Sequence, residues 1–571
     1  MTTSSYAPTV AYFTMEACLA AGMPTYSGGL GVLAGDTLRA AADLGVPMVG
    51  LTMLYRRGFF RQHLDENGRQ SEEPFTWDPQ DFVEPLEARV SVTLEGRRIV
   101  LGAWTFTIHG ITGQDVKVFL LDTDLEENDP QDREIGAQLY GGDRRNRLRQ
   151  EAVLGLGGVA LIKELGLDSV ETFHMNEGHC SFLTLALLDH ASGRGEELDT
   201  SPETVEKVRE HCVFTTHTPV PAGHDQFYMD LVHSVMEPKF AHAIERIPVF
   251  TDGMLNMTHL GMFFARYVNA VARRHRETAR HMHPAHHIES VTNGVHATTW
   301  VSKPMGELYD REIPQWRYDN HALRQALLIP IEKVVEGHAK AKRDLFTEIS
   351  SRTGTKLDPN VLTVGFARRA ATYKRADMIF SDMDRLATIA QEGWPIQFVF
   401  AGKAHPSDEA GKALIQRVVE AQHQLKGRVP VVYLEEHDME LGRLLCAGVD
   451  LWLNNPQKPL EASGTSGMKA ALNGVPSLSV LDGWWPEGWL EGVTGWSIGD
   501  SMEATDDWHS EVESLYYKLR YVIIPLYYGS STGFARVMRS TIAVNGAYFT
   551  AQRMVEEYIE NAYTPHPAAR A

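Results

Sequence analysis

Cysteine is scarce in this sequence: four residues in 571, far apart, with no CxxC pair. This spacing argues against a disulfide framework or a cysteine zinc site and favours reduced thiols in a cytoplasmic protein. Basic residues are also in deficit, because 54 Lys and Arg stand against 74 Asp and Glu. A net charge of −20 argues against nucleic acid or an anionic membrane as partner. Any anion site must therefore be local.

Long apolar runs and repeats are missing as well. No stretch approaches the roughly 18 apolar residues of a membrane helix. The first residues lack the basic and apolar regions of a signal peptide, so we expect a soluble, cytoplasmic protein. The chain is nevertheless 43% hydrophobic. At this length a single core is not expected, and two large domains are predicted.

Strand-like apolar runs alternate with helical patterns along most of the chain, which is typical of parallel α/β sheets. In the first half we predict strands at 10–16, 48–54, 172–176 and 213–218 and helices at 32–44 and 153–165. In the second half we predict strands at 362–366, 396–401, 429–434, 449–455 and 477–481. The pattern predicts two Rossmann-like, doubly wound domains facing across a cleft. Their expected extents are 1–305 and 306–546, with a last helix at about 547–563 returning to the first domain.

The segment from Glu461 to Lys469, Glu-Ala-Ser-Gly-Thr-Ser-Gly-Met-Lys, lies between a strand-like run and a short apolar helix. Unpaired N–H groups at a helix start attract phosphate, and the hydroxyls of Thr465 and Ser466 can add to them. Lys469, one turn further on, could form a Schiff base with an aldehyde anchored by that phosphate. The same loop could also be a simple helix cap followed by a surface lysine.

A second candidate anion site follows the predicted strand 362–366, where Arg368, Arg369, Lys374 and Arg375 stand within eight residues. Arg offers a planar fork and Lys a mobile charge, so together they can hold a dianion. The alternative is a solvated basic helix face. The turn Gly28-Gly29-Leu30-Gly31 could also present N–H groups to an anion, although such turns are common in α/β connections.

The histidines and tryptophans form less specific patterns than the two anion-site segments. His174, Glu177 and His179 lack the HExxH spacing and are predicted to be hydrogen-bonding cleft residues rather than metal ligands. The histidine-rich stretch 275–287 is predicted to form a polar helix and loop surface, with metal binding as the minor alternative. Trp484, Trp485 and Trp489 are predicted to cover a core edge; the alternative is a sugar platform.

Taken together, these segments resemble the α-glucan phosphorylases, the glycogen, starch and maltodextrin phosphorylases of glycosyltransferase family 35, which have the two-domain GT-B fold. The resemblance runs from Tyr12–Glu16 to the tryptophan cluster, and its most specific motif is Glu461 to Lys469. It implies pyridoxal 5′-phosphate held by Lys469. The other cofactor-binding groups it implies are Thr465, Ser466, Arg368, Trp300 and the main chain of Gly29.

The resemblance also implies a catalytic role for Arg369 and Lys374, which would clamp the substrate phosphate, and for His217, beside the reacting ring. The sugar-binding groups it implies are Glu461, Ser463, Gly464, Tyr373, Asn293 and Leu30. The implied reaction is retaining phosphorolysis of an α-1,4-glucan by inorganic phosphate to give α-glucose 1-phosphate, with the cofactor's 5′-phosphate in acid/base catalysis. This agrees with the lack of an evident glycosidase carboxylate pair.

The chain departs from the long enzymes in three respects. Several of their insertions are absent, so the extended glycan-anchoring surface is not expected and the chain-length preference stays open. The chain begins shortly before Tyr12, so a short form without the N-terminal regulatory extension is expected, and without that kind of allosteric control. His437 and Asp438 stand where the long enzymes place a Tyr-Arg pair, so the cofactor-phosphate contacts there are expected to differ. Related enzymes are often homodimers, but no interface can be identified from one sequence.

Two alternatives stay open at this point. A nucleotide-sugar-dependent glucosyltransferase of the glycogen-synthase type shares the fold but has no need of Lys469. A catalytically silent glycan-binding protein would be expected to lose Arg369, Lys374 or Lys469, and all three are present.

Overall fold

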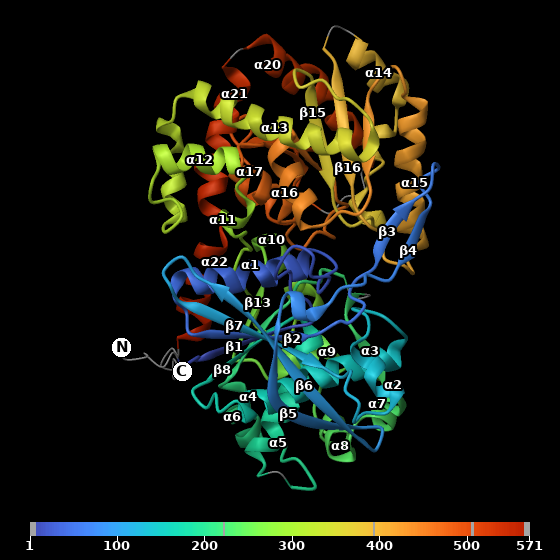
Figure 1. Cartoon of the computed structure of the whole chain (residues 1–571), viewed down its shortest axis with the longest axis vertical. Helices are drawn as coiled ribbons and strands as arrows, with labels where there is room; N and C mark the ends of the chain where they lie inside the picture. Colours follow the sequence, from blue (N-terminus) through green and yellow to red (C-terminus); the bar gives the residue numbers. More distant parts are fainter. Residues whose placement is uncertain are drawn as a thin grey trace.

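The computed structural model describes residues 7–193, 195–220, 223–391, 394–503, 508–530 and 532–564. The chain forms two α/β lobes, which lie one above the other in Figure 1. This confirms the predicted fold class. No helix in the described ranges combines the length and apolar character that crossing a membrane would require.

The N-terminal lobe is built on a nine-stranded sheet of order β14-β13-β9-β8-β1-β2-β7-β6-β5. The strands are β1 Val10–Thr14, β2 Met48–Met53, β5 Glu84–Leu94, β6 Arg97–His109, β7 Asp115–Asp122, β8 Thr172–Asn176, β9 Cys212–Thr215, β13 Tyr267–Ala270 and β14 Glu289–Ser290. From β14 to β7 neighbouring strands are parallel, while β6 and β5 are antiparallel additions. Two small antiparallel sheets join β3 Arg61–Leu64 to β4 Gln70–Glu73, and β12 Met254–Asn256 to β10 Gln226–Tyr228 and β11 Phe250–Thr251.

Helices follow most of these strands. They are α1 Gly29–Leu44, α2 Pro130–Arg133, α3 Arg144–Ala152, α4 Gly158–Glu164, α5 Leu183–Ala191, α6 Pro202–Arg209, α7 Met229–Val235, α8 Pro238–Glu245, α9 Met257–Phe263, α10 Arg273–Met282 and α11 Ala297–Trp300. The helix predicted at 153–165 is the second half of a longer one, because a π-helical turn, Val153–Gly157, joins α3 to α4. The predicted strand at 213–218 ends earlier, at Thr215.

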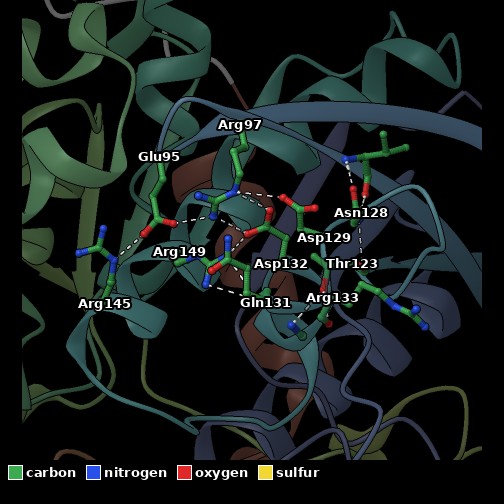
Figure 2. Close-up of polar contacts among 12 residues, drawn as sticks. Glu95, Arg97, Thr123, Asn128, Asp129, Gln131, Asp132, Arg133, Arg145 and Arg149 are labelled. Atoms are coloured by element: carbon green, nitrogen blue, oxygen red, sulfur yellow. Dashed lines mark hydrogen bonds and ion pairs between the residues drawn. The ribbon is translucent and has the colours of Figure 1, made fainter.

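An ion-pair cluster fastens the β5–β6 turn to the helices beside it (Figure 2). Arg97 donates from Nε and Nη2 to both carboxylate oxygens of Asp132, at 2.9 and 2.8 Å, and from Nη2 to Glu95 at 2.6 Å. Arg149 pairs with the same Asp132 and Arg145 with Glu95. Hydrogen bonds from Arg97 lower the pKa of Asp132. Asp129 Oδ2 lies 3.8 Å from Arg97 Nε, so three arginines stand against three carboxylates, and we assign the cluster a structural role.

The C-terminal lobe is built on a six-stranded parallel sheet of order β17-β16-β15-β18-β19-β20. The strands are β15 Leu362–Ala367, β16 Ile396–Ala401, β17 Val431–Leu434, β18 Leu451–Asn454, β19 Ser477–Val480 and β20 Gly495–Ile498. The strand predicted at 429–434 starts only after Pro430, which has no N–H to donate. The strand order reverses between β15 and β18. Doubly wound sheets bind ligands at the carboxyl ends of the strands at such a reversal.

Helices cover both faces of this sheet (Figure 1). They are α12 Lys303–Glu312, α13 Ile331–Thr353, α14 Met383–Gln391, α15 Glu409–Gln424, α16 Met439–Gly448, α17 Ser466–Leu472, α18 Trp485–Gly488, α19 Trp508–Lys518, α20 Ile524–Gly529, α21 Gly533–Thr541 and α22 Ala551–Tyr558. The last of these crosses to the N-terminal lobe and packs on α1. Met554 and Tyr558 of α22 join the apolar cluster that contains Leu38 of α1.

The β3–β4 hairpin extends from the N-terminal lobe along the second lobe beside α15 (Figure 1). Gln62 lies at the centre of this contact and is buried. Its Nε2 donates to the carbonyl of Gly402 at 2.9 Å, and its Oε1 accepts the N–H of Glu436 at 2.9 Å. Lys412 on α15 pairs with Glu72 on β4 at 3.0 Å. Polar contacts of the hairpin therefore connect the lobes.

Candidate active site

The predicted site residues come from the carboxyl ends of strands in both sheets. Arg368 follows β15 directly, and Glu461 lies in the loop after β18, so both stand at the strand-order reversal of the second lobe. His217 follows β9 and Asn293 follows β14 in the first lobe. The glycine-rich turn follows β1 and begins α1.

Glu461 is the centre of a buried charge cluster. Its Oε2 accepts hydrogen bonds from Arg368 Nη2 at 2.8 Å and from Lys374 Nζ at 2.5 Å. Burial by itself would raise the pKa of this carboxyl group, but Arg368 and Lys374 lower it to about 2. Glu461 is therefore ionised at neutral pH. Both cations use the same oxygen, so the carboxylate is held in one orientation.

Ser463 and Gly464 continue the turn beside this cluster. Gly464 has a φ of +81°, and a Cβ there would lie 3.2 Å from Arg368 Nη2. Glycine is thus favoured both by its backbone conformation and by the close approach of the guanidinium. The Ser463 hydroxyl is buried and has no hydrogen-bond partner in the described structure. It is a polar group that a ligand hydroxyl could satisfy.

Lys469 is buried against Trp300. Its Nζ lies 3.7 Å from the centre of the indole ring. Burial lowers the pKa of Lys469, which favours the neutral, nucleophilic amine. Within the described ranges the amine has no hydrogen bond or ion pair. The Trp300 Nε1 donates to Asp36 Oδ2 at 2.8 Å, which fixes the ring on α1.

Further residues near Lys469 belong to the same part of the site. Ser466 starts α17, and its hydroxyl accepts the Nε1–H of Trp452 at 3.1 Å, while the Thr465 side chain makes no capping bond to α17. His437 stands next to Trp300, since a Cβ on Gly442 would lie 3.5 Å from His437 Nε2 and 3.8 Å from the indole. Burial, with Lys469 nearby, lowers the pKa of His437 to about 3. Asp438 caps α16 and accepts the N–H of Leu441 at 2.8 Å.

Arg369 is the solvent-exposed member of the basic segment. Partial desolvation by the surrounding protein opposes its charge, but Tyr373 and the facing Glu16 and Tyr140 raise its pKa above the usual value. Arg369 therefore faces the N-terminal lobe across the cleft. Lys374 Nζ lies 4.5 Å from the centre of the Tyr373 ring.

Glu16 stabilises the glycine-rich turn. Its Oε2 accepts the N–H of Ser27 at 2.5 Å and that of Gly28 at 3.3 Å. A Cβ on Gly29 would meet nothing within 4 Å, whereas on Gly31 it would lie 2.6 Å from the Tyr26 Cβ. The start of the turn is open, and Leu30 beside it is half-buried.

His217 is positioned by the loop after β8. Its N–H donates to Glu177 Oε2 at 2.7 Å, and its Nε2 lies 2.6 Å from Asn176 Oδ1. Burial lowers the pKa of His217 to about 4, so the imidazole is neutral at pH 7. Asn293 keeps a buried Oδ1 with no partner among the described residues, and its carbonyl accepts Arg553 Nη2 of α22 at 3.0 Å.

The structure corrects two histidine predictions. His174 is not a cleft residue: it is buried in the core, 2.8 Å from Tyr563 Oη and 2.8 Å from Thr215 Oγ1. His275 and His283, predicted on a polar surface, are buried with 1% and 5% exposure. Trp484 and Trp485 are buried, as predicted. In the described part of the chain, no group of three or more His, Cys, Asp or Glu residues has a metal-binding arrangement.

Sequence reasoning missed Glu16 and Asp36 as supporting residues. Glu16 belongs to the motif that begins at Tyr12 and stands just after β1, a position that could have indicated its contact with the turn. Asp36 lies inside an apolar helix, where a buried carboxylate requires a partner, but no local signal identifies that partner as Trp300.

Comparisons with known proteins agree with this site. A family model described as carbohydrate phosphorylase matches residues 200–485. A maltodextrin phosphorylase of Thermococcus litoralis is 38% identical, with 97% of this chain and 70% of that relative covered. Glycogen phosphorylases of Mycobacterium tuberculosis and Aquifex aeolicus are 36% and 35% identical, with 97% and 94% of this chain and 71% and 84% of those relatives covered.

Proposed function

This chain belongs to the carbohydrate phosphorylase family, and we propose that it releases α-glucose 1-phosphate from the non-reducing end of an α-1,4-glucan such as maltodextrin, glycogen or starch. The reaction consumes inorganic phosphate and retains the anomeric configuration. The observation that carries the proposal is one short segment with two functional ends. At one end Glu461 is held by Arg368 and Lys374, and at the other Lys469 is buried against Trp300.

The surroundings of Lys469 fit pyridoxal phosphate. Among the described residues the amine forms no ion pair, its pKa is lowered by burial, and it lies against the Trp300 indole, which suits attachment of an aldehyde and stacking of its ring. Pyridoxal phosphate, when bound, would supply a phosphate group that exchanges a proton with the substrate phosphate. The residues that would hold it are Lys469, Thr465, Ser466, Arg368, Trp300 and the main chain of Gly29.

Arg369 and Lys374 would hold the substrate phosphate. Arg369 is exposed and interacts electrostatically with Glu16, the residue that binds the glycine-rich turn, and the main-chain N–H of Gly29 in that turn could add a hydrogen bond. Cations in a partly dehydrated cleft stabilise a dianion more strongly than cations in water. They would also orient one phosphate oxygen toward the glycosidic oxygen, which is the atom that must receive a proton when the bond breaks.

The sugar would lie between Glu461 on one lobe and His217 and Asn293 on the other. An ionised Glu461 can only accept hydrogen bonds, so it would bind sugar hydroxyls as an acceptor. Ser463 Oγ and Asn293 Oδ1, both buried without partners in the described ranges, can take further hydroxyls. Tyr373, Gly464 and Leu30 would complete the subsite. The neutral imidazole of His217 can approach the reacting ring without a charge of its own.

The same proposal divides the chain near residue 305. Residues 1–305 would form the glucan- and phosphate-binding lobe and residues 306–546 the cofactor-binding lobe. The crossing of α22 to α1 supports a return of residues 547–563 to the first lobe.

Incubation with maltoheptaose and inorganic phosphate tests the function. We expect glucose 1-phosphate to form in proportion to added phosphate, and none when phosphate is replaced by a nucleoside diphosphate. Glucosyl transfer from a nucleotide sugar without any dependence on phosphate would refute the proposal and favour the glycogen-synthase alternative. The family membership and the buried Lys469 both argue against that outcome.

A further inference from the structure

Asp482 lies two residues beyond β19 and is 3% exposed. Its Oδ2 accepts the main-chain N–H of Glu461 at 2.9 Å. Its Oδ1 is buried and finds no hydrogen-bond partner within the described residues. A buried carboxyl group thus binds the main chain of the residue at the centre of the charge cluster.

The strand end around Asp482 determines the shape of the Glu461 turn. Trp484 N–H donates to the carbonyl of Ser463 at 2.9 Å, so a second hydrogen bond holds the same turn. Gly483 between them has a φ of +60°. A Cβ there would lie 2.3 Å from the Ser463 carbonyl oxygen and 3.0 Å from Glu461 Cγ. The turn and the strand end therefore fit together closely, and Asp482 is the side chain that joins them.

The charges around Asp482 come from both lobes. Burial and the negative charge of Glu461 raise the pKa of Asp482 to about 7, although the main-chain N–H groups of Glu461 and Gly483 and the guanidinium of Arg274 lower it. Arg274 belongs to α10 of the facing lobe, and its Nε is buried without a partner in the described structure. Asp482 therefore changes its charge near neutral pH, beside a carboxylate that stays ionised.

We propose that Asp482 is a positioning residue for sugar binding, which fixes the main chain of Glu461 through Oδ2 and so orients the Glu461 carboxylate. The inference rests on the proposed function, which assigns Glu461 to the sugar. When Asp482 loses its proton, a second negative charge stands next to Glu461. The two carboxylates then compete for the surrounding cations. Sugar binding should therefore weaken as pH rises through about 7.

Two variants separate the roles of the two oxygens. Asp482→Ala removes the acceptor of the Glu461 N–H, and we expect it to raise KM for glucose 1-phosphate by about tenfold or more, with kcat within about threefold. Asp482→Asn keeps a carbonyl acceptor and removes the titration. It should restore KM to within about threefold of wild type at pH 6 and lack the rise in KM between pH 6 and 8.

The substrate phosphate also titrates in this range, so a matched control is needed. Glu491→Gln changes a carboxylate of the same lobe that likewise accepts a main-chain N–H, from Ser497 at 3.0 Å, but lies outside the site. This control should keep the wild-type pH profile. Calorimetric binding of glucose 1-phosphate, thermal unfolding and cofactor absorbance are recorded for every variant.

Three results would overturn the inference. The first is a wild-type KM in Asp482→Ala, and the second is an unchanged pH profile of KM in Asp482→Asn. The third is an equal loss of activity in both variants that parallels a loss of thermal stability and of bound cofactor. A wild-type protein that forms no glucose 1-phosphate would instead refute the proposed function. The two failures are therefore distinguishable, because the first requires an active wild-type enzyme.

Discussion

The Lys469 Nζ atom lies 3.7 Å from the centre of the Trp300 indole ring. Asn473 holds both residues, since its Nδ2 donates to the carbonyls of Trp300 at 2.9 Å and of Lys469 at 3.0 Å. The amine is therefore desolvated and oriented by the protein itself, before any ligand binds. A surface lysine with the same sequence neighbours would have neither property.

Lys469→Ala should remove cofactor and activity together. The reason is that Lys469 carries the side-chain amine of α17, so pyridoxal phosphate would lose its covalent anchor. We expect the near-ultraviolet absorbance to disappear and phosphorolysis to fall by at least about 10³-fold. Absorbance before and after borohydride reduction, and release of glucose 1-phosphate, measure the two effects.

Lys340→Ala is the control for this experiment, because Lys340 is an exposed lysine of the same lobe that pairs with Glu336 on the same helix. It should leave cofactor and activity unchanged. A fully active, cofactor-free Lys469→Ala protein would contradict the role given to Lys469.

Glu461→Gln should weaken sugar binding more than it weakens the fold. The substitution takes the shared charged acceptor away from Arg368 and Lys374, and two charge-assisted hydrogen bonds of this kind correspond to roughly 100-fold or more in kcat/KM. In steady-state kinetics with glucan and phosphate varied separately, we expect the loss to appear in kcat/KM for glucan. The exposed Glu409→Gln serves as the control, and equal effects of the two variants would argue against a site role.

The same cluster predicts the pH range over which Glu461 functions. Because its pKa is lowered to about 2, Glu461 keeps its charge at every pH at which the enzyme is assayed. Above pH 4, the acid limb of the kcat/KM profile should therefore have the same shape in wild type and Glu461→Gln, once both profiles are scaled to the same maximum. An acid limb that vanishes in the variant would show that Glu461 titrates there.

Gln62→Ala should loosen the contact between the lobes. It leaves the N–H of Glu436 without its acceptor at a buried interface, a cost of about 1–3 kcal/mol, while the carbonyl of Gly402 keeps the hydrogen bond from the Tyr433 hydroxyl. We expect KM to rise roughly fivefold for glucan and phosphate alike, because both bind between the lobes. Kinetics and the radius of gyration from small-angle scattering test this. The exposed Gln80→Ala should behave as wild type; unchanged KM values in Gln62→Ala would refute the coupling.

Stability should decrease as pH falls from about 6.5 toward 3. His174 is buried, and burial lowers its pKa to about 3, so over this range the unfolded chain takes up a proton that the folded protein does not. Each such group contributes up to about 1.4 kcal/mol per pH unit. Thermal unfolding of His174→Gln should depend less on pH than that of wild type. The exposed His281→Gln should keep the full dependence, and identical slopes in all three proteins would exclude this origin.

Local patterns were sufficient for the buried parallel strands. Residues 362–366 and 396–401 are continuous apolar runs, and they form β15 and β16 with nearly the same bounds. The long antiparallel β5 and β6 were not predicted, because one face of each is exposed and their polar residues interrupt the apolar signal. β20, Gly495–Ile498, was not predicted either.

The partners of individual side chains were harder to predict than the helices and strands. The motif Glu461 to Lys469 indicated a ligand segment, but not that Glu461 binds Arg368 and Lys374 through one oxygen, nor that Asp482 holds its main chain. His174 and His275 were assigned to polar surroundings, since a single histidine carries no local sign of burial.

The sequence by itself determined the α/β class, the two-lobed organisation and the segments that carry chemistry, because apolar periodicity and dense local motifs are properties of neighbouring residues. Only the tertiary structure decided which charges meet. Trp300 and Asp36 are joined across 264 positions of sequence. The pKa values of Glu461, Lys469 and Asp482 follow from burial and from charges that the fold brings together, and neither can be read from a linear chain.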